Sequence, residues 1–179
     1  GKKRYQSILE NTDFTVTAIS EMNHLALQNI SDEVKIFDSY QKLVDHGDIE
    51  VIFISLPNKF AAHAVSISLK KELHVFCEKP PSRTLNELIE VQKIFNTQPS
   101  LKLMYGFNHR FHLSVEEAKF LIDQDKFGGI INMKGVYGKS QMISFNQTDW
   151  RTKREESGGG ILLDQGIHML DLMRYLSGE

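Results

Sequence analysis

Two patterns of apolar residues alternate along the first part of the chain. Runs of β-branched and aromatic residues are separated by segments in which apolar residues recur every three or four positions. The run 49–56 is the clearest strand, because it is nearly unbroken, and we expect it to be buried on both faces. The pattern predicts helices at 1–10, 40–45, 60–70 and 84–96 (the last opened by the capping box Thr84-Leu-Asn-Glu87) and strands at 14–19, 34–37, 49–56, 73–77 and 101–105. Strands that alternate with helices in this way form a parallel sheet, which predicts the α/β class.

The rhythm changes after this alternating region. A second capping box, Ser114-Val-Glu-Glu117, predicts a helix that runs to about residue 125, and Gly128-Gly129 ends it. The segment 130–137 alternates like a strand with one exposed face, and a polar loop and a further helix follow it. We therefore expect two domains, a doubly wound domain at 1–105 and the start of an α+β domain at 106–179.

Composition narrows the class of protein. Of the 179 residues, 41% are hydrophobic and 25% are charged, and the formal net charge of −2 gives no basic excess for binding nucleic acid. No stretch approaches the ~18 apolar residues that a membrane-spanning helix needs. The single cysteine, Cys77, excludes an internal disulfide, and its place in an apolar run indicates a buried structural thiol. We interpret the protein as cytoplasmic, since one unpaired cysteine fits a reducing compartment.

Polar residues follow the predicted strands where a ligand would bind. In doubly wound sheets, ligands bind beyond the carboxyl ends of the parallel strands. Four such ends carry side chains that can make specific contacts: Glu21, Pro57-Asn58, Glu78-Lys79-Pro80, and Asn108 with Arg110. We expect this edge of the sheet to form the ligand site.

Glu21 directly follows the strand at 14–19 and lies about 20 residues after Gly1, where a dinucleotide-binding unit places the acid that binds the adenosine ribose. Such a carboxylate repels a 2′-phosphate, so it favours NAD over NADP. An ordinary turn acid would give the same pattern. If Gly1 is the third glycine of a G-x-G-x-x-G turn, the first strand of the sheet precedes this chain. We expect a piece of a longer protein, because the chain begins without methionine.

Lys79 places a positive charge just after the strand at 73–77. An ammonium group there, with Pro80 fixing the direction of the chain, can donate a hydrogen bond to a substrate hydroxyl and favour a developing alkoxide. The alternative is an ordinary surface pair formed by Glu78 and Lys79.

Three glycines, 158–160, precede the last helix and let the backbone approach another group closely. Asp164 and His168 are spaced i,i+4, so a regular helix places them on one face, with Asp171 continuing the stripe beside a buried apolar stripe that includes Leu170. Histidine titrates near neutral pH and is the commonest general acid–base. The alternative is a capping acid and a half-buried structural histidine. A metal site is disfavoured, because no third ligand has suitable spacing.

The other histidines carry weaker signals. His24, His46 and His112 read as surface or turn residues. His63 and His109 lie near strand ends and can approach a ligand, although an ordinary role fits both better.

Taken in order, these motifs resemble the glucose–fructose oxidoreductase / inositol dehydrogenase (Gfo/Idh/MocA) family of NAD(P)-dependent oxidoreductases. The resemblance runs along essentially the whole chain. Its motifs are Gly1 with Glu21, Ser55-Leu-Pro-Asn58 with His63, Cys77-Glu-Lys-Pro80, Gly106-Phe-Asn-His-Arg-Phe111, and Trp150-Arg151 through the three glycines to Asp164 and His168. It implies a Rossmann-like doubly wound parallel sheet, incomplete at its N-terminus, followed by the start of an α+β open-sheet domain.

The resemblance also implies a role for each matched residue. Lys79 would contact the hydroxyl being oxidised, His168 would remove its proton, and Asp164 would bind and orient the substrate. The implied cofactor-binding residues are Gly1, Glu21, Ser55, Pro57, Asn58, His63, Glu78, Lys79, Pro80 and Asn108. The implied substrate-binding residues are Lys79, Arg110, Trp150, Arg151, Asp164 and His168.

The implied activity is hydride transfer between NAD(P) and a hydroxyl of a sugar, cyclitol or nucleotide-sugar. The full-length protein would be a homo-oligomer, and the chain alone would be inactive. Two alternatives remain open, an NAD-dependent glycosidase of the same family and a non-enzymatic nucleotide-binding sensor or repressor. Lys79, Asp164 and His168 together favour an enzyme, since a pure binder needs no acid–base pair.

Overall fold

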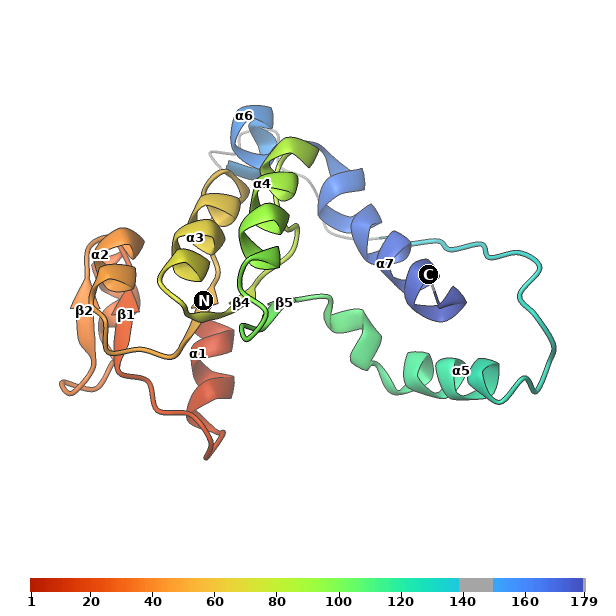
Figure 1. Ribbon diagram of the computed structural model, residues 1–179, viewed down its shortest axis with the longest axis horizontal. Coiled ribbons are helices and arrows are strands. Elements are labelled where there is room, and N and C mark those ends of the chain that lie inside the picture. The colour runs from red at the N-terminus through yellow and green to blue at the C-terminus, as the bar shows by residue number, and fades with distance from the viewer. Residues whose placement is uncertain (139–149, 179) are drawn as a thin grey trace. The chain divides into compact units, whose positions relative to one another are not determined.

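The structure is a computed structural model that describes residues 1–138 and 150–178. It divides into two compact units, Gly1–Tyr105 and Gly106–Glu179, and each is described by itself below (Figure 1). Within the described ranges, no helix is long and apolar enough to cross a membrane.

The strands of the first unit are all parallel, as the alternating pattern predicts. Hydrogen bonds join β1 (Ala18–Ser20) to β2 (Lys35–Phe37), and β4 (His74–Cys77) to both β3 (Val51–Ile54) and β5 (Leu103–Tyr105). The orders β2-β1 and β3-β4-β5 correspond to strands 3-2 and 4-5-6 of the order 3-2-1-4-5-6 in doubly wound dinucleotide-binding sheets. The place of strand 1 in that order lies between β1 and β3, and the described residues form no strand there.

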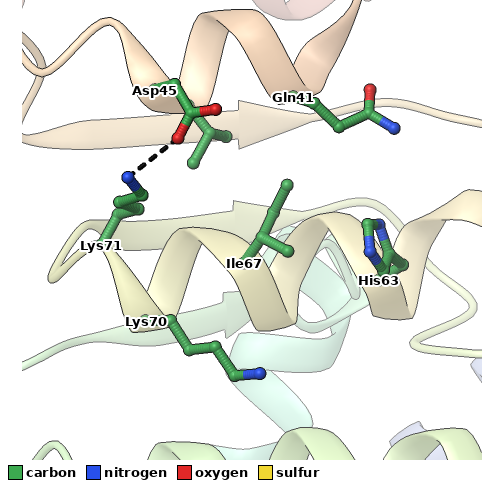
Figure 2. Close-up of a pocket in the computed structure, with 7 residues that line it drawn as sticks. Gln41, Asp45, His63, Ile67, Lys70 and Lys71 are labelled. Carbon is green, nitrogen blue, oxygen red and sulfur yellow. Dashed lines mark ion pairs between the residues drawn. The ribbon is translucent and has the colours of Figure 1, made fainter.

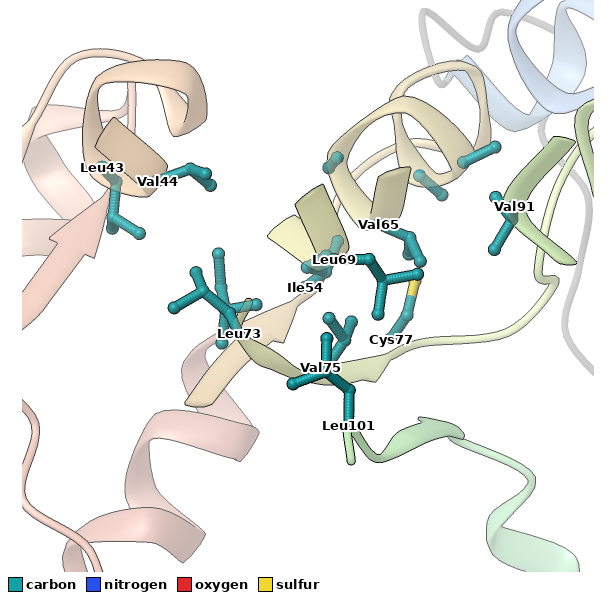
Figure 3. Packing of buried hydrophobic residues seen from close by; sticks show 14 residues of the cluster. Leu43, Val44, Ile54, Val65, Leu69, Leu73, Val75, Cys77, Val91 and Leu101 are labelled. Atoms are coloured by element: carbon teal, nitrogen blue, oxygen red, sulfur yellow. The ribbon is translucent and has the colours of Figure 1, made fainter. Parts of the chain in front are cut away.

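Five short helices complete the first unit: α1 (Lys2–Leu9), the 3₁₀ turn η1 (His24–Leu27), α2 (Tyr40–Asp45), α3 (Asn58–Lys70) and α4 (Leu85–Asn96). In Figure 1, α3 and α4 lie on one side of β4 and β5, and α1 lies on the other. The core forms beneath α3, whose Val65 and Leu69 are fully buried against Cys77 and its neighbours (Figure 3).

The strand at 49–56 is not buried on both faces as expected. Burial alternates along β3, with Ile52 and Ile54 in the core and Phe53 half-buried. The ring of Phe53 contacts Phe14 and Phe76, with centroids 5.8 and 5.5 Å away. Aromatic rings therefore cover this second face only in part. The helix α1 does not complete the cover, since none of its own residues is buried.

Half of the capping box expected at Thr84 is present. The Thr84 hydroxyl accepts a hydrogen bond from the Glu87 N–H at 3.3 Å at the start of α4. The Glu87 carboxylate accepts from the N–H of Arg83 at 2.9 Å, one residue before the position that a full box uses.

The capping box at Ser114 is wrong, because α5 (Leu113–Asp123) begins one residue earlier. The chain enters this helix from the 3₁₀ turn η2 (Asn108–Phe111), so the carbonyl of His112 already accepts from Val115 and Glu116 at 2.8 and 3.0 Å. Ser114 therefore lies inside the helix instead of at its N-cap.

The second unit continues with η3 (Trp150–Thr152), α6 (Arg154–Ser157), a π-helical turn η4 (Leu162–Gly166) and α7 (Ile167–Ser177). The strand expected at 130–137 is wrong, since none of the described residues pairs with this segment. A strand needs a neighbour for its backbone groups, and here Ile131 is fully exposed. The segment packs instead against α7, where Gly135 lies against the side chain of Met169.

Candidate functional site

The carboxyl ends of β3 and β4 lie side by side. Ile54 is in register with Cys77, and the N–H of Glu78 donates to the carbonyl of Ile54 at 2.9 Å. Ser55 and Glu78, which follow these strands, therefore share one edge of the sheet with Lys79. The helix α3 also begins at this edge, so its N-terminal N–H groups and partial positive charge lie there.

Glu78 is held by a residue that sequence reasoning missed. The guanidinium of Arg4, in the first turn of α1, lies 2.6 Å from the Glu78 carboxylate and 4.8 Å from the centre of the Phe76 ring. This contact ties the first helix to the turn that carries Lys79. The one signal for this contact in the sequence is a basic residue three positions after Gly1, and such a residue is too common to single out.

Lys79 is half-buried, and the Pro80 that follows it is buried. The peptide bond between them is cis. At the neighbouring strand end, Pro57 is the N-cap of α3 and Asn58, its first residue, is only 6% exposed. These positions agree with the expected clustering of polar residues at one edge.

Glu21 directly follows β1, as the sequence predicts, and it is exposed. One of its carboxylate oxygens accepts a hydrogen bond from the N–H of Asn23 at 2.8 Å. This contact stabilises the turn, and it orients the carboxylate at the end of the strand.

His63 lies on α3 and faces α2, where its Nδ1 is 2.9 Å from the hydroxyl of Tyr40. It lines a pocket of about 250 Å³ between the two helices (Figure 2). Lys70 and an ion pair between Lys71 and Asp45, 2.8 Å apart, form the other end of this pocket. Because Lys70 and Lys71 come just before β4 begins, this pocket lies toward the amino ends of the strands, away from Lys79.

Cys77 is buried and unsuited to nucleophilic chemistry. Burial, and then the charge of Glu78, raise the pKa of its thiol to about 12. The thiolate is the nucleophilic form, so Cys77 is inert near neutral pH. Burial likewise raises the pKa of the Tyr105 hydroxyl on the neighbouring strand.

In the second unit, the helix that carries Asp164 and His168 is not regular. Leu162–Gly166 form a π-helical turn, and α7 starts only at Ile167. A π-turn holds an extra residue, so the regular helix expected to run from Asp164 to His168 is interrupted between them. The Asp164 carboxylate accepts a hydrogen bond from the Gln165 side chain at 2.8 Å. Such turns occur frequently at functional sites.

The buried face of α7 is polar, contrary to expectation. Its buried residues are His168 and Asp171, which are 4% and 8% exposed, whereas Leu170 is 63% exposed. The π-turn changes the rotation of the chain before α7, and the stripe inferred from an unbroken α-helix is therefore misplaced.

Three aromatic or imidazole side chains surround His168, and we call this set the ring cluster: Phe107, His109 and Tyr137 with His168 itself. The imidazoles of His109 and His168 are stacked, with centroids 4.1 Å apart and planes 12° apart. Phe107 meets His168 edge to face at 6.2 Å, and Tyr137 lies 6.3 Å away. Sequence reasoning treated His109 as ordinary and did not single out Tyr137, because these residues meet only through the tertiary fold.

Arg110, an expected substrate-binding residue, pairs with Asp171. Its Nε donates to Asp171 Oδ2 at 2.8 Å, and a second guanidinium nitrogen donates to Oδ1. These hydrogen bonds raise the pKa of the Arg110 guanidinium. The guanidinium also lies over the ring of Tyr175 at 5.1 Å. The pair therefore fastens η2, which carries His109, to α7, which carries His168.

We expect Arg110→Ala to lower the free energy of unfolding by about 2 kcal/mol, because it leaves the buried Asp171 carboxylate without its guanidinium partner. Thermal unfolding of the complete protein measures the loss. Arg174→Ala is the control, since Arg174 is an exposed arginine on α7, the helix that carries Asp171. Equal melting temperatures for the two variants would show that the pair does not stabilise the unit.

The remaining expected residues lie on η3 and η2. The guanidinium of Arg151 lies 4.5 Å from the centre of the Trp150 ring, and Asn108 is exposed at the start of η2. Gly158 ends α6 with a φ of 82°, a left-handed conformation that favours glycine. Among the described residues, no group of three acidic, histidine or cysteine side chains is placed to hold a metal ion.

Comparisons with known proteins agree with this geometry. Residues 1–107 match the family described as "Oxidoreductase family, NAD-binding Rossmann fold", and residues 115–179 match the "GFO/IDH/MocA C-terminal domain". A levoglucosan dehydrogenase from Pseudarthrobacter phenanthrenivorans is 30% identical over 78% of this chain and 36% of its own length.

Two solved structures share the fold. A myo-inositol 2-dehydrogenase from Lactobacillus plantarum superposes with a TM-score of 0.85 at 28% identity, covering 99% of this chain and 53% of that one. A levoglucosan dehydrogenase in complex with NADH and levoglucosan gives a TM-score of 0.84 at 27% identity, covering 92% and 45%. The chain thus spans about half the length, or less, of the proteins that it matches.

Proposed function

This chain belongs to the GFO/IDH/MocA family of oxidoreductases, and on that premise we propose that the protein transfers a hydride between NAD and a hydroxyl of a sugar or cyclitol. The observation that carries the proposal is the burial of an ionisable imidazole, His168, among rings at the end of a π-helical turn. A buried ionisable side chain is a candidate for acid–base chemistry. The related levoglucosan dehydrogenase was solved with NADH and a sugar bound.

The residues at the carboxyl edge of the first unit fit a dinucleotide. The N-terminus of α3 supplies N–H groups and partial positive charge, which suit a phosphate-containing ligand. Glu21 supplies a carboxylate at the end of β1 for ribose hydroxyls. We assign cofactor binding to this edge, with Ser55, Pro57, Asn58 and Glu78 beside it. When bound, the nicotinamide accepts the hydride.

We assign the proton chemistry to His168 and Lys79. His168, as a neutral imidazole, takes the hydroxyl proton while the carbon–hydrogen bond breaks and a carbonyl forms. Lys79 donates a hydrogen bond to the same oxygen and stabilises the negative charge that develops on it. Asp164, half-buried on the π-turn that precedes His168, binds a neighbouring substrate hydroxyl.

A panel of sugars, cyclitols and nucleotide-sugars tests the proposal with NAD and the complete protein. We expect at least one of them to give a stoichiometric rise in the absorbance of reduced nicotinamide. Cleavage of a glycoside without net NADH would indicate an NAD-dependent glycosidase instead. Tight binding of NAD with no turnover of any member would favour a nucleotide-binding sensor, and either result would refute the dehydrogenase.

We expect the complete protein to bind NAD more tightly than NADP, because the exposed carboxylate of Glu21 repels a 2′-phosphate. Glu21→Ala should reduce the ratio of the dissociation constants for NADP and NAD by about tenfold or more, because NAD would bind more weakly and NADP more tightly. Titration calorimetry with both cofactors measures it, and Glu10→Ala, an exposed acid at the end of α1, serves as the control. Tighter binding of NADP by the unmodified protein would refute the assignment of Glu21.

A further inference from the structure

The contact between His109 and His168 has no place in the chemistry assigned above. Their rings stack face to face at 4.1 Å and 12°, although His109 belongs to η2 and His168 to α7. The nitrogens of an imidazole lie in the plane of its ring, so a stacked contact does not form a hydrogen bond between the two rings. His109 therefore covers one face of His168 without bonding to the nitrogens of its ring.

The surroundings restrict the ring of His168 on other sides as well. Phe107 approaches it edge-on, with planes 88° apart, and the tilted ring of Tyr137 lies 5.4 Å from His109 and 6.3 Å from His168. The bidentate pair of Arg110 with Asp171 holds the two backbone segments together on either side of the stack. A base must point at its proton within a narrow range of angles, and a ring fixed in this way needs little reorganisation to do so.

The stack also has an electrostatic consequence. Two imidazolium ions whose centres are 4.1 Å apart repel strongly, so the pair disfavours a state in which both carry a proton. His168 is only 4% exposed, whereas His109 is half-buried, and burial disfavours the charged form. The first proton is therefore expected on His109, which leaves His168 neutral.

Other charged groups face this pair from each element packed around it. On η2 the charge of Arg110 is compensated by Asp171, and beyond η2 the ring of His112 lies 5.3 Å from His109. Tyr137 contributes its ring, and Lys119 of α5 lies over Tyr175, one turn beyond Asp171. Asp164, on the π-turn, opposes the effect because a carboxylate favours a protonated imidazole.

We propose that His109 is a positioning residue for the proposed base: its ring fixes the plane of His168, and its charge keeps the resting His168 unprotonated. The inference rests on the proposed role of His168 and deepens it. His109 touches neither substrate nor cofactor in this assignment and acts through His168 alone.

Two substitutions separate the two effects. His109→Phe keeps a flat ring in the stack and removes the charge, so the midpoint of the rise in kcat/KM with pH should move up by about one unit, with the plateau nearly unchanged. His109→Ala removes the ring as well, and the plateau should fall by about tenfold. His46→Phe changes an imidazole at the end of α2, in the other compact unit, and it should alter neither quantity.

A readout that needs no substrate keeps this test independent of the proposed function. The NMR titration of the His168 ring in the complete protein should show the same upward shift in His109→Phe and none in His46→Phe. That shift in a protein that turns over no sugar would support the stack and refute the dehydrogenase. An unchanged His168 titration in His109→Phe overturns the electrostatic role, and an unchanged plateau in His109→Ala overturns the positioning role, whatever the activity.

Discussion

His168→Asn is expected to lower kcat/KM by about 10²–10⁴, the range for losing a positioned general base. Asparagine keeps a polar side chain of similar reach but cannot accept a proton near neutral pH. The rise of kcat/KM with pH should therefore disappear along with the rate. His168 is 4% exposed, so bulk water has little access to the site and replaces the lost base poorly.

The pH profile of kcat/KM, with His46→Asn as a matched control, distinguishes this role from a structural one. His46 lies at the end of α2 and contacts Phe37 and Lys35, so its loss should leave the profile in place. A His168→Asn enzyme that is slower but keeps the same pH dependence would mark His168 as a structural histidine.

Lys79→Ala is expected to lower kcat by about 10²–10⁴, because the ammonium stabilises charge that develops only in the transition state. The substrate KM should change much less than kcat, since the ground-state hydroxyl carries no charge. NAD binding should persist, because Glu21 and the start of α3 remain in place.

Steady-state kinetics with Lys70→Ala as the control measures this effect. Lys70 is an exposed lysine at the end of α3, on the pocket between α2 and α3 that lies toward the opposite edge of the sheet (Figure 2). A Lys79→Ala enzyme with a rate near that of the unmodified protein would end the proposed role of Lys79.

The sequence predicts the first unit well because its signals are local. The pattern of apolar residues identifies β2–β5 and the helices α1–α4, and the motif at Thr84 marks the start of α4. The strand expected at 14–19 overlaps β1 only at its end, and the pattern does not predict the 3₁₀ turn η1. The polar residues at the strand ends follow from the same logic, since parallel strands bring their carboxyl ends to one edge. Family membership then follows from ordered motifs.

The second unit shows where local signals fail. The segment 130–137 has the alternation of a strand, but a strand also needs a partner for its backbone, and the described residues offer it none. The π-turn at Leu162–Gly166 inserts an extra residue, which the spacing of apolar residues does not predict. In the helix that follows it, His168 and Asp171 face inward and Leu170 faces outward.

The contacts of the site residues are equally hidden. Arg4 reaches Glu78, and Arg110 reaches Asp171, across long stretches of chain. The stack of His109 on His168 arises in the same way, from two elements that meet only in the folded unit. Composition and spacing identified the ionisable residues, whereas tertiary structure decides which of them pair with one another.

The central proposal is that the amine of Lys79 and the imidazole of His168 act on the same hydroxyl in one transition state. The most direct measurement is kcat/KM for Lys79→Ala combined with His168→Asn, compared with the two single variants. Groups that act as a unit give strongly non-additive losses, so we expect the double variant to be within about tenfold of the slower single one. Losses that multiply in full would show that the two residues act independently, and would contradict the account.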